Sequence, residues 1–235
     1  MNTALLFSKA FLSGALELRR KESLLNRINV FPVVDADTGT NMCQTLSSTI
    51  ELLAGDLPGD LESLASQARE RLLGDARGNS GVIFSSFLAA FLGSFLEEGS
   101  ITFSSFRNAV ALGRDAAYSS VADPVEGTLL TTMTDLASSL GSAQGRATLD
   151  THASIESQIR DSVAGTPELL PKLRRAGVVD SGALGFYLFS SGLTLILPAL
   201  DGSESALSKI EARIKGEETA PFGNIKDTIL TSFLS

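Results

Sequence analysis

Two aspartates separated by one residue stand in a polar stretch near the N-terminus. Asp35 and Asp37 are followed directly by the polar residues 38–41, which run Thr-Gly-Thr-Asn. In an extended loop, side chains two residues apart point the same way, so both carboxylates can hold one hard cation. Mg²⁺ takes one or two carboxylates together with water and substrate phosphates. The stretch is therefore a candidate metal–nucleotide site, and the alternative is an Asx-turn in which Asp37 or Thr38 caps a helix.

A glycine-rich loop with one arginine precedes the most apolar segment of the chain. Residues 73–81 run Leu-Gly-Asp-Ala-Arg-Gly-Asn-Ser-Gly. Free amides at a helix start, together with Arg77, would attract an anion such as phosphate. The chain has no G-x-x-x-x-G-K-[ST] motif, and no lysine occurs between Glu22 and Pro171, so this loop is not a P-loop. The alternative is an ordinary glycine-rich turn.

Two further loops have the same polar, glycine-punctuated character. Residues 123–128 run Asp-Pro-Val-Glu-Gly-Thr, and residues 174–183 include two arginines, an aspartate and two glycines. In an up-and-down helix bundle, alternate loops lie at the same end and can converge on one ligand. Four ordinary helix connections are the alternative.

The elements that must position these loops are helices. Apolar residues recur at steps of three and four in Phe84, Phe87, Leu88, Phe91 and Phe95, which is the spacing of one helix face. Further stripes of this kind are found at residues 3–20, 41–54, 61–73, 103–120, 128–140, 153–163 and 183–198. The segment 28–34 looks like a strand but contains Pro32, so we expect an extended loop there.

Capping residues support these helices. Asp60, Thr102 or Ser104, Asp150 or Thr151, and Asp180–Ser181 are the expected N-caps. About eight helices result, so we expect one all-α domain over residues 1–200. The composition becomes polar at residue 201, and residues 201–235 are expected to be a linker or the start of a further domain. A tail that packs back on the domain is the alternative.

Composition restricts the functions open to the chain. It has 235 residues and a net charge of −8, and an acidic surface argues against a nucleic-acid partner. The single Cys43 cannot form an internal disulfide, and the single His152 cannot supply a histidine metal cluster; both fit a reducing, cytoplasmic location. No signal peptide is expected. The apolar runs 81–96 and 185–200 fall short of a membrane span and predict buried helices.

Four ordered motifs resemble those of a known family. Residues 29–42, 76–83, 124–128 and 177–182 closely resemble the motifs of the DhaL-type kinase domain. The most similar branch is the ATP-binding domain of bacterial fatty acid kinase and its relatives fused to lipid-carrier domains. The resemblance covers about residues 3–200. It implies a barrel of eight antiparallel amphipathic helices that binds a nucleotide at one end through its loops.

The resemblance also implies roles for individual residues. Asp35 and Asp37 match the catalytic, metal-binding aspartates that hold two Mg²⁺ ions against the phosphates of ATP, and Asn29 stands where a further metal ligand is found. The nucleotide (ATP or ADP) would be bound by Thr38, Gly39, Thr40, Asn41, Arg77, Asn79, Ser80, Gly127, Thr128, Arg175, Asp180 and Gly182.

One residue departs from the pattern of that branch, which has glycine between the two aspartates. This chain has Ala36 there. An alanine is tolerated only where the backbone needs no positive φ, so we expect a negative φ and intact metal binding.

The function implied by the resemblance is an ATP-dependent kinase that phosphorylates a fatty acid presented by a separate lipid-carrier protein or domain. The product would be an acyl phosphate, and the domain would be inactive without its partner. A dihydroxyacetone kinase-like subunit and a non-catalytic nucleotide-binding module are the alternatives, and a homodimer stays open. We expect His152 to lie in a polar connection, Cys43 to be a packing residue, and the 13 phenylalanines to form the core.

Overall fold

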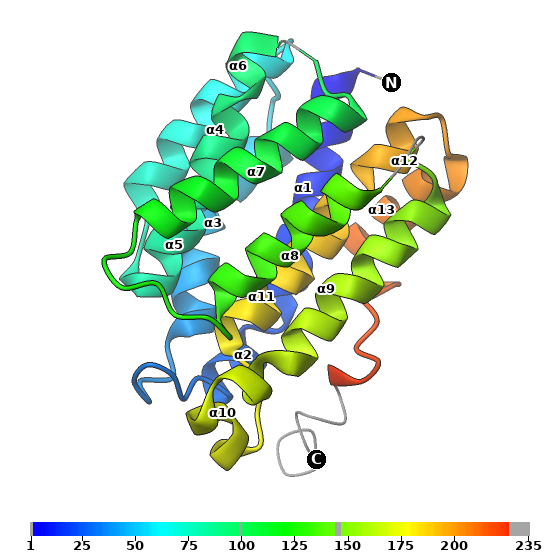
Figure 1. Cartoon of the computed structure of the whole chain (residues 1–235). Helices are drawn as coiled ribbons and strands as arrows, with labels where there is room; N and C mark the ends of the chain where they lie inside the picture. The colour runs from blue at the N-terminus through cyan, green and yellow to red at the C-terminus, as the bar shows by residue number, and fades with distance from the viewer. Residues whose placement is uncertain (1, 99, 144–146, 226–235) are drawn as a thin grey trace.

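The computed structural model describes residues 2–98, 100–143 and 147–225, which form helices and no strand (Figure 1). The prediction of an all-α fold is confirmed. The helices are α1 (Thr3–Arg20), α2 (Glu22–Arg27), α3 (Thr38–Ala54), α4 (Leu61–Asp75), α5 (Gly78–Gly93), α6 (Phe95–Glu98), α7 (Phe103–Ser119), α8 (Leu129–Ser142), α9 (Leu149–Leu169), α10 (Pro171–Ala176), α11 (Ser181–Leu193), α12 (Ile196–Leu200) and α13 (Glu204–Lys215).

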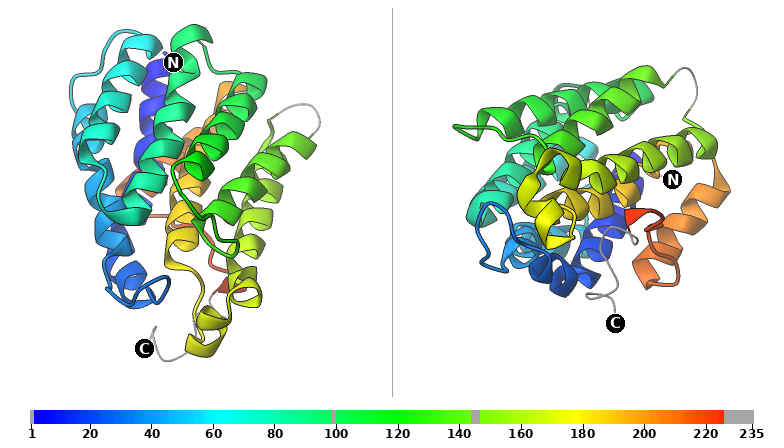
Figure 2. Two further views of the ribbon diagram at one scale, coloured as in Figure 1. Left: turned by 60° about the vertical axis from the view of Figure 1, so that its left-hand side comes forward. Right: turned by 60° about the horizontal axis from the view of Figure 1, so that its bottom comes forward.

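Helix α11 runs through the middle of the bundle. It contacts α1, α3, α8 and α9, and every one of its residues is buried (Figures 1 and 2). The stretch Ser181–Leu200 is long and apolar enough to cross a membrane by length and composition alone, but 94% of it is buried inside the fold. Its apolar character is therefore explained by its central position, as expected for the run 185–200.

Glycines let α1 approach α11 closely. A Cβ added to Gly14 would lie 2.0 Å from the carbonyl oxygen of Phe189, and one added to Gly192 would lie 2.3 Å from the amide nitrogen of Gly14. No side chain can be accommodated at either position without separating the two helices. This contact fixes α11, and with it the loop that precedes α11.

Aromatic rings fill the space between α1, α5, α7 and α11. The Phe91 ring lies 5.1 Å from Phe95 and 5.3 Å from Phe106, and the Phe189 ring lies 5.0 Å from Phe11, all edge to face. Such pairs add about 0.5–1.5 kcal/mol each to their area burial. Nine of the 13 phenylalanines are fully buried, which confirms the predicted core role for these nine. Phe31, Phe103 and Phe222 are partly buried against the core, and Phe233 lies outside the described residues.

The expected N-caps are confirmed at three helices. The side chains of Asp60, Thr102 and Asp180 accept hydrogen bonds from the first turns of α4, α7 and α11. The expectation for α9 was wrong, because α9 begins at Leu149 and its N-cap is Thr148.

The earlier start of α9 places His152 inside the helix. Its Nε2 lies 3.1 Å from the carbonyl oxygen of Ser191, and burial lowers the pKa of the ring. The prediction of a polar connection at His152 was therefore wrong. Residues 148–158 are polar in sequence, but the imidazole is on the face that packs against α11.

The described part of the C-terminal segment packs against the bundle. Arg20 of α1 donates hydrogen bonds of 2.7 Å to the carbonyl oxygens of Arg213 and Ile214, and the Tyr187 hydroxyl of α11 donates to the carbonyl oxygen of Pro221. The domain limit at residue 200 stays a prediction, and residues 226–235 lie outside the described residues.

Candidate functional site

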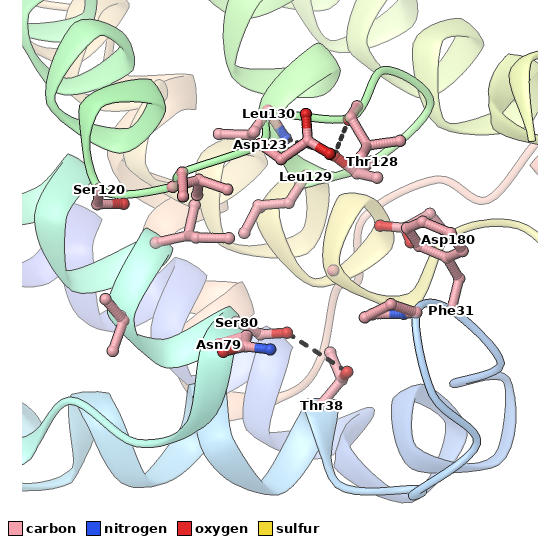
Figure 3. A pocket seen from close by; sticks show the side chains of 17 residues that line it. Phe31, Thr38, Asn79, Ser80, Ser120, Asp123, Thr128, Leu129, Leu130 and Asp180 are labelled. Carbon is pink, nitrogen blue, oxygen red and sulfur yellow. Dashed lines mark hydrogen bonds between the residues drawn. The ribbon is translucent and has the colours of Figure 1, made fainter.

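A pocket of about 460 Å³ opens at one end of the bundle, where several helices begin (Figure 3). It is walled by the 29–37 loop, the starts of α3 and α5, the 120–128 loop and the start of α11. Six of its residues were predicted from the sequence to bind nucleotide: Thr38, Asn79, Ser80, Thr128, Asp180 and Gly182. The predicted convergence of the four loops is therefore confirmed.

Four helix N-termini meet at this pocket. Helix α3 begins at Thr38, α5 at Gly78, α8 follows its N-cap Thr128, and α11 follows its N-cap Asp180. Each N-terminus carries amide N–H groups without a partner inside the helix and about half a positive charge from the helix dipole. Some of these amides are capped by side chains: Leu130 donates to the Thr128 hydroxyl and Ala183 to Asp180. Helix starts that meet at one cavity can attract an anion. Among the described residues, the wall itself contains two carboxyl groups, Asp123 and Asp180, and no basic side chain, so a ligand with phosphate groups would need a cation beside it.

Two glycines of α5 allow the starts of α3 and α5 to approach each other closely. Gly78 has φ +59°, and a Cβ there would lie 2.3 Å from the side-chain nitrogen of Asn41. A Cβ on Gly81 would lie 2.5 Å from the hydroxyl of Thr45. This close approach brings the hydroxyls of Thr38 and Ser80 to 3.4 Å from one another at the pocket wall.

Asp35 and Asp37 lie on the loop between two residues of the pocket wall, Pro32 and Thr38. Asp35 Oδ1 accepts a hydrogen bond from the side-chain amide of Asn29. Asp37 occupies the N-cap position of α3, but its side chain accepts no capping bond. The alternative interpretation of Asp37 as a helix cap is therefore correct for its position but not for its side chain, which makes no capping bond.

By the chemistry of their oxygens, these two carboxylates could hold a metal only together with a ligand. Among the described residues, no group of three or more His, Cys, Asp or Glu side chains could hold an ion by itself. Two carboxylate oxygens beside a pocket suit Mg²⁺ because its remaining positions are filled by water and phosphate. Asn29 turns its NH₂ group toward Asp35, so here it orients the carboxylate.

Ala36 has φ +54°, so the expectation of a negative φ was wrong. For a residue with a Cβ, this left-handed conformation costs about 1–2 kcal/mol. The loop adopts it because it must turn between the two aspartates.

We therefore expect Ala36→Gly to stabilise the fold. Ala36 is exposed, so little packing is lost, and removal of the strain outweighs the greater entropy of the unfolded glycine chain. The expected gain in the free energy of unfolding is about 0.5–1 kcal/mol, measured by urea denaturation. A loss of stability would contradict the backbone conformation described here.

Asp180 is the buried carboxyl of the pocket. Its Oδ1 accepts a hydrogen bond of 2.8 Å from the amide of Ala183, and its own amide donates to the Thr166 hydroxyl. The side chain is 5% exposed, and burial raises the pKa of Asp180 to about 6, against the lowering effect of the backbone amides.

The raised pKa of Asp180 predicts a pH effect on stability. Because the folded state holds the proton more tightly than the unfolded state, this stabilisation is complete below about pH 4 and is lost as the pH rises through about 6. Asp180→Asn keeps the capping oxygen and needs no proton. We expect it to be more stable than the native chain by about 2 kcal/mol at pH 8, and by much less at pH 4. Urea denaturation at both pH values measures the difference, and an equal difference at both would contradict the assignment.

Three predicted residues of the first motif face neighbouring helices. A Cβ on Gly39 would lie 2.5 Å from the carbonyl oxygen of Glu22, so this glycine serves the contact with α2. Thr40 donates its hydroxyl to Glu22 Oε1 and its amide to Asn26 Oδ1. Asn41 lies against Gly78. These residues do not line the pocket.

Arg77, Gly127 and Arg175 also lie outside the pocket wall. The Arg77 guanidinium donates to the carbonyl oxygens of Gly74 and Ala76 in its own loop. Gly127 has φ +82° and packs against Leu169 at the end of α9. The side chain of Arg175 is exposed on α10.

An apolar wall of the pocket was not predicted from the sequence. Beside the polar residues lie Phe31, Pro32, Val82, Ile83, Val121, Ala122, Val125, Leu129 and Leu130, together with Ser120 and Asp123. Figure 3 shows Leu129 and Leu130 across the pocket from Ser80 and Thr38. A face of this kind suits a flat apolar group such as a nucleotide base. Val82 is 42% exposed on the apolar helix α5. The apolar run 81–96 by itself predicted only a buried helix.

Cys43 packs against the core at partial burial, as predicted. Burial raises the pKa of its thiol to about 12, so the thiolate that a nucleophile requires is not formed at neutral pH.

Comparisons with known proteins agree with this architecture. Residues 32–195 match the DAK2 domain family. The chain is 35% identical over 221 residues to an uncharacterized protein of Staphylococcus epidermidis, covering 93% of this chain and 39% of that protein. It is also 35% identical over 213 residues to protein YloV of Bacillus subtilis, covering 85% of this chain and 38% of that protein. The chain thus spans about two fifths of the length of these relatives.

A solved structure has the same fold. The dihydroxyacetone kinase from C. freundii, in complex with AMP-PNP and Mg²⁺, superimposes with a TM-score of 0.61 at 21% identity, over 83% of this chain and 34% of that one. The DhaL-like fold expected from the motifs is therefore confirmed. Because the family match covers most of the helical bundle, this chain belongs to the DAK2 domain family, the DhaL-type kinase domains.

Proposed function

We propose that this chain is the ATP- and Mg²⁺-binding domain of a kinase that phosphorylates a fatty acid held by a lipid-carrier protein. The main support is one observation: four helix N-termini meet at one pocket, and the loop that carries Asp35 and Asp37 runs between two residues of the pocket wall, Pro32 and Thr38, although neither aspartate lines the pocket itself. An anion and a hard cation can both be bound there. The similar dihydroxyacetone kinase binds AMP-PNP and Mg²⁺, which supports the same ligands for this chain.

In this proposal, the pocket and the loop beside it bind different parts of the Mg²⁺–nucleotide complex. Asp35 and Asp37 would hold two Mg²⁺ ions, and such ions neutralise the charge that develops on a transferred phosphoryl group. The Thr38 and Ser80 hydroxyls and the nearby amides would donate hydrogen bonds to phosphate oxygens. The apolar wall would cover the base. Because no lysine occurs between Glu22 and Pro171, the phosphate charge is balanced by metal, amides and helix ends.

In this proposal, a lipid-carrier protein in the cytoplasm presents the fatty acid that accepts the phosphoryl group. The phenylalanines that could have lined an acyl channel are packed edge to face inside the bundle. The relatives are about two and a half times as long as this chain, which leaves room in them for regions that bind such a partner.

An assay of acyl phosphate tests the proposal. The chain alone should bind Mg²⁺–ATP and form no acyl phosphate from a long-chain fatty acid. A full-length relative supplied with a lipid-carrier protein should form it. Phosphorylation of dihydroxyacetone would instead establish the dihydroxyacetone kinase-like alternative. Nucleotide binding without turnover in the full-length protein would establish a regulatory module.

A further inference from the structure

The 120–128 loop forms one wall of the pocket and joins α7 to α8. It contributes side chains from Ser120, Val121, Asp123 and Val125 to that wall. A loop that carries so much of a binding surface must be held in one conformation, because any ordering left to the moment of binding lowers affinity.

Glu126 lies in this loop but not in the pocket wall. Its Oε1 accepts a hydrogen bond of 2.9 Å from the Tyr118 hydroxyl, in the last turn of α7. Its Oε2 accepts one of 2.6 Å from the Thr131 hydroxyl, in the first turn of α8. One carboxylate thus ties together the two helices that the loop connects.

The network extends to the backbone of the loop. The amide of Gly127 donates a hydrogen bond of 2.7 Å to the Thr131 hydroxyl, and the Thr134 hydroxyl donates one of 3.2 Å to the Tyr118 oxygen. Hydroxyl bonds to an ionised carboxylate are shorter and stronger than neutral ones. Glu126 is exposed, so its effect is on the shape of the loop and not on burial of the core.

We propose that Glu126 is a positioning residue of the pocket. By joining Tyr118 to Thr131, it holds the 120–128 loop in the shape that lines the pocket, and it does so without touching the ligand. The consequence for ligand affinity rests on the proposed function, whereas the consequence for the loop does not.

Hydrogen exchange of the ligand-free chain tests the loop directly. In Glu126→Ala, the amides of Gly127 and Leu130, which donate to the Thr131 and Thr128 hydroxyls, should exchange about five- to tenfold faster, since two charge-assisted hydrogen bonds are lost. Glu126→Gln should restore part of the protection, because its amide oxygen still accepts one hydroxyl. Glu70→Ala, which removes an exposed glutamate from α4, is the matched control and should leave these amides unchanged.

Nucleotide affinity gives the second readout. The Kd of Mg²⁺–AMP-PNP should rise about fivefold in Glu126→Ala, while the urea midpoint stays close to that of the native chain. Unchanged amide exchange in the loop of Glu126→Ala would overturn the proposal. Faster exchange throughout the chain, α4 included, together with a lowered urea midpoint would also overturn it, because Glu126 would then stabilise the whole fold. If the native chain binds no nucleotide, the proposed function fails, and the exchange data alone still decide the role of Glu126.

Discussion

Replacing Asp37 with alanine should abolish Mg²⁺-dependent nucleotide binding and leave the helices intact. The Asp37 side chain accepts no capping bond from α3, so its loss costs the helix little. It is one of two carboxylates beside the pocket, and a metal that keeps only one of them is held far more weakly. Loss of a residue that merely supports a metal ligand costs 10–100-fold, so we expect at least about 100-fold here.

Calorimetric titration with AMP-PNP, with and without Mg²⁺, measures this effect. Asp56→Ala is the matched control, because Asp56 is exposed just beyond the opposite end of α3 and its loss changes the net charge equally. The control should bind like the native chain, and circular dichroism should show the same helix content in all three. Native-like affinity in Asp37→Ala would remove Asp37 from the metal site.

The second large effect concerns the fold. Arg213 of α13 is 2% exposed, and its guanidinium donates hydrogen bonds of 3.0 Å to Glu156 Oε1 on α9 and 3.0 Å to the Ser191 hydroxyl on α11. Arg213→Met leaves the Glu156 carboxylate buried without its cation. Breaking one side of a buried ion pair in this way costs about 3–5 kcal/mol.

Urea denaturation measures the loss, with Lys215→Met as the control from the exposed face of the same helix. The double variant Arg213→Met/Glu156→Leu should recover much of the stability, since it removes both charges together. A single variant within 1 kcal/mol of the native chain, or a double variant less stable than the single one, would contradict this account.

The sequence predicted the long helices because their apolar stripes are local patterns. The spacing at residues 3–20 and 61–73 gave the bounds of α1 and most of α4. The stripe shows which face of a helix is buried, but it carries little information about what covers that face. Arginine side chains are mostly exposed unless they are paired, whereas the structure buries Arg213 against Glu156 of α9 and Ser191 of α11.

The candidate site could also be predicted only in part, because local motifs identify the loops but not the direction in which each side chain points. The motifs identified the loops, and the helix order brought them to one end of the bundle. Within a motif, the turn of the helix decides which side chains reach the pocket. Thr38 does, whereas Thr40 is rotated toward α2 and bonds to Glu22. The left-handed backbone at Ala36 could not be read from a residue type that rarely adopts it.

The central claim is that the ligand of the pocket is a metal–nucleotide complex held beside Asp35 and Asp37. Paramagnetic broadening of backbone amide signals by Mn²⁺, a substitute for Mg²⁺, tests it most directly. With AMP-PNP present, the amides of residues 35–39 and 79–81 should broaden, and those of α6, at the opposite end of the bundle, should stay sharp (Figure 1). Broadening that is the same without the nucleotide, or that is centred away from this pocket, would contradict the account.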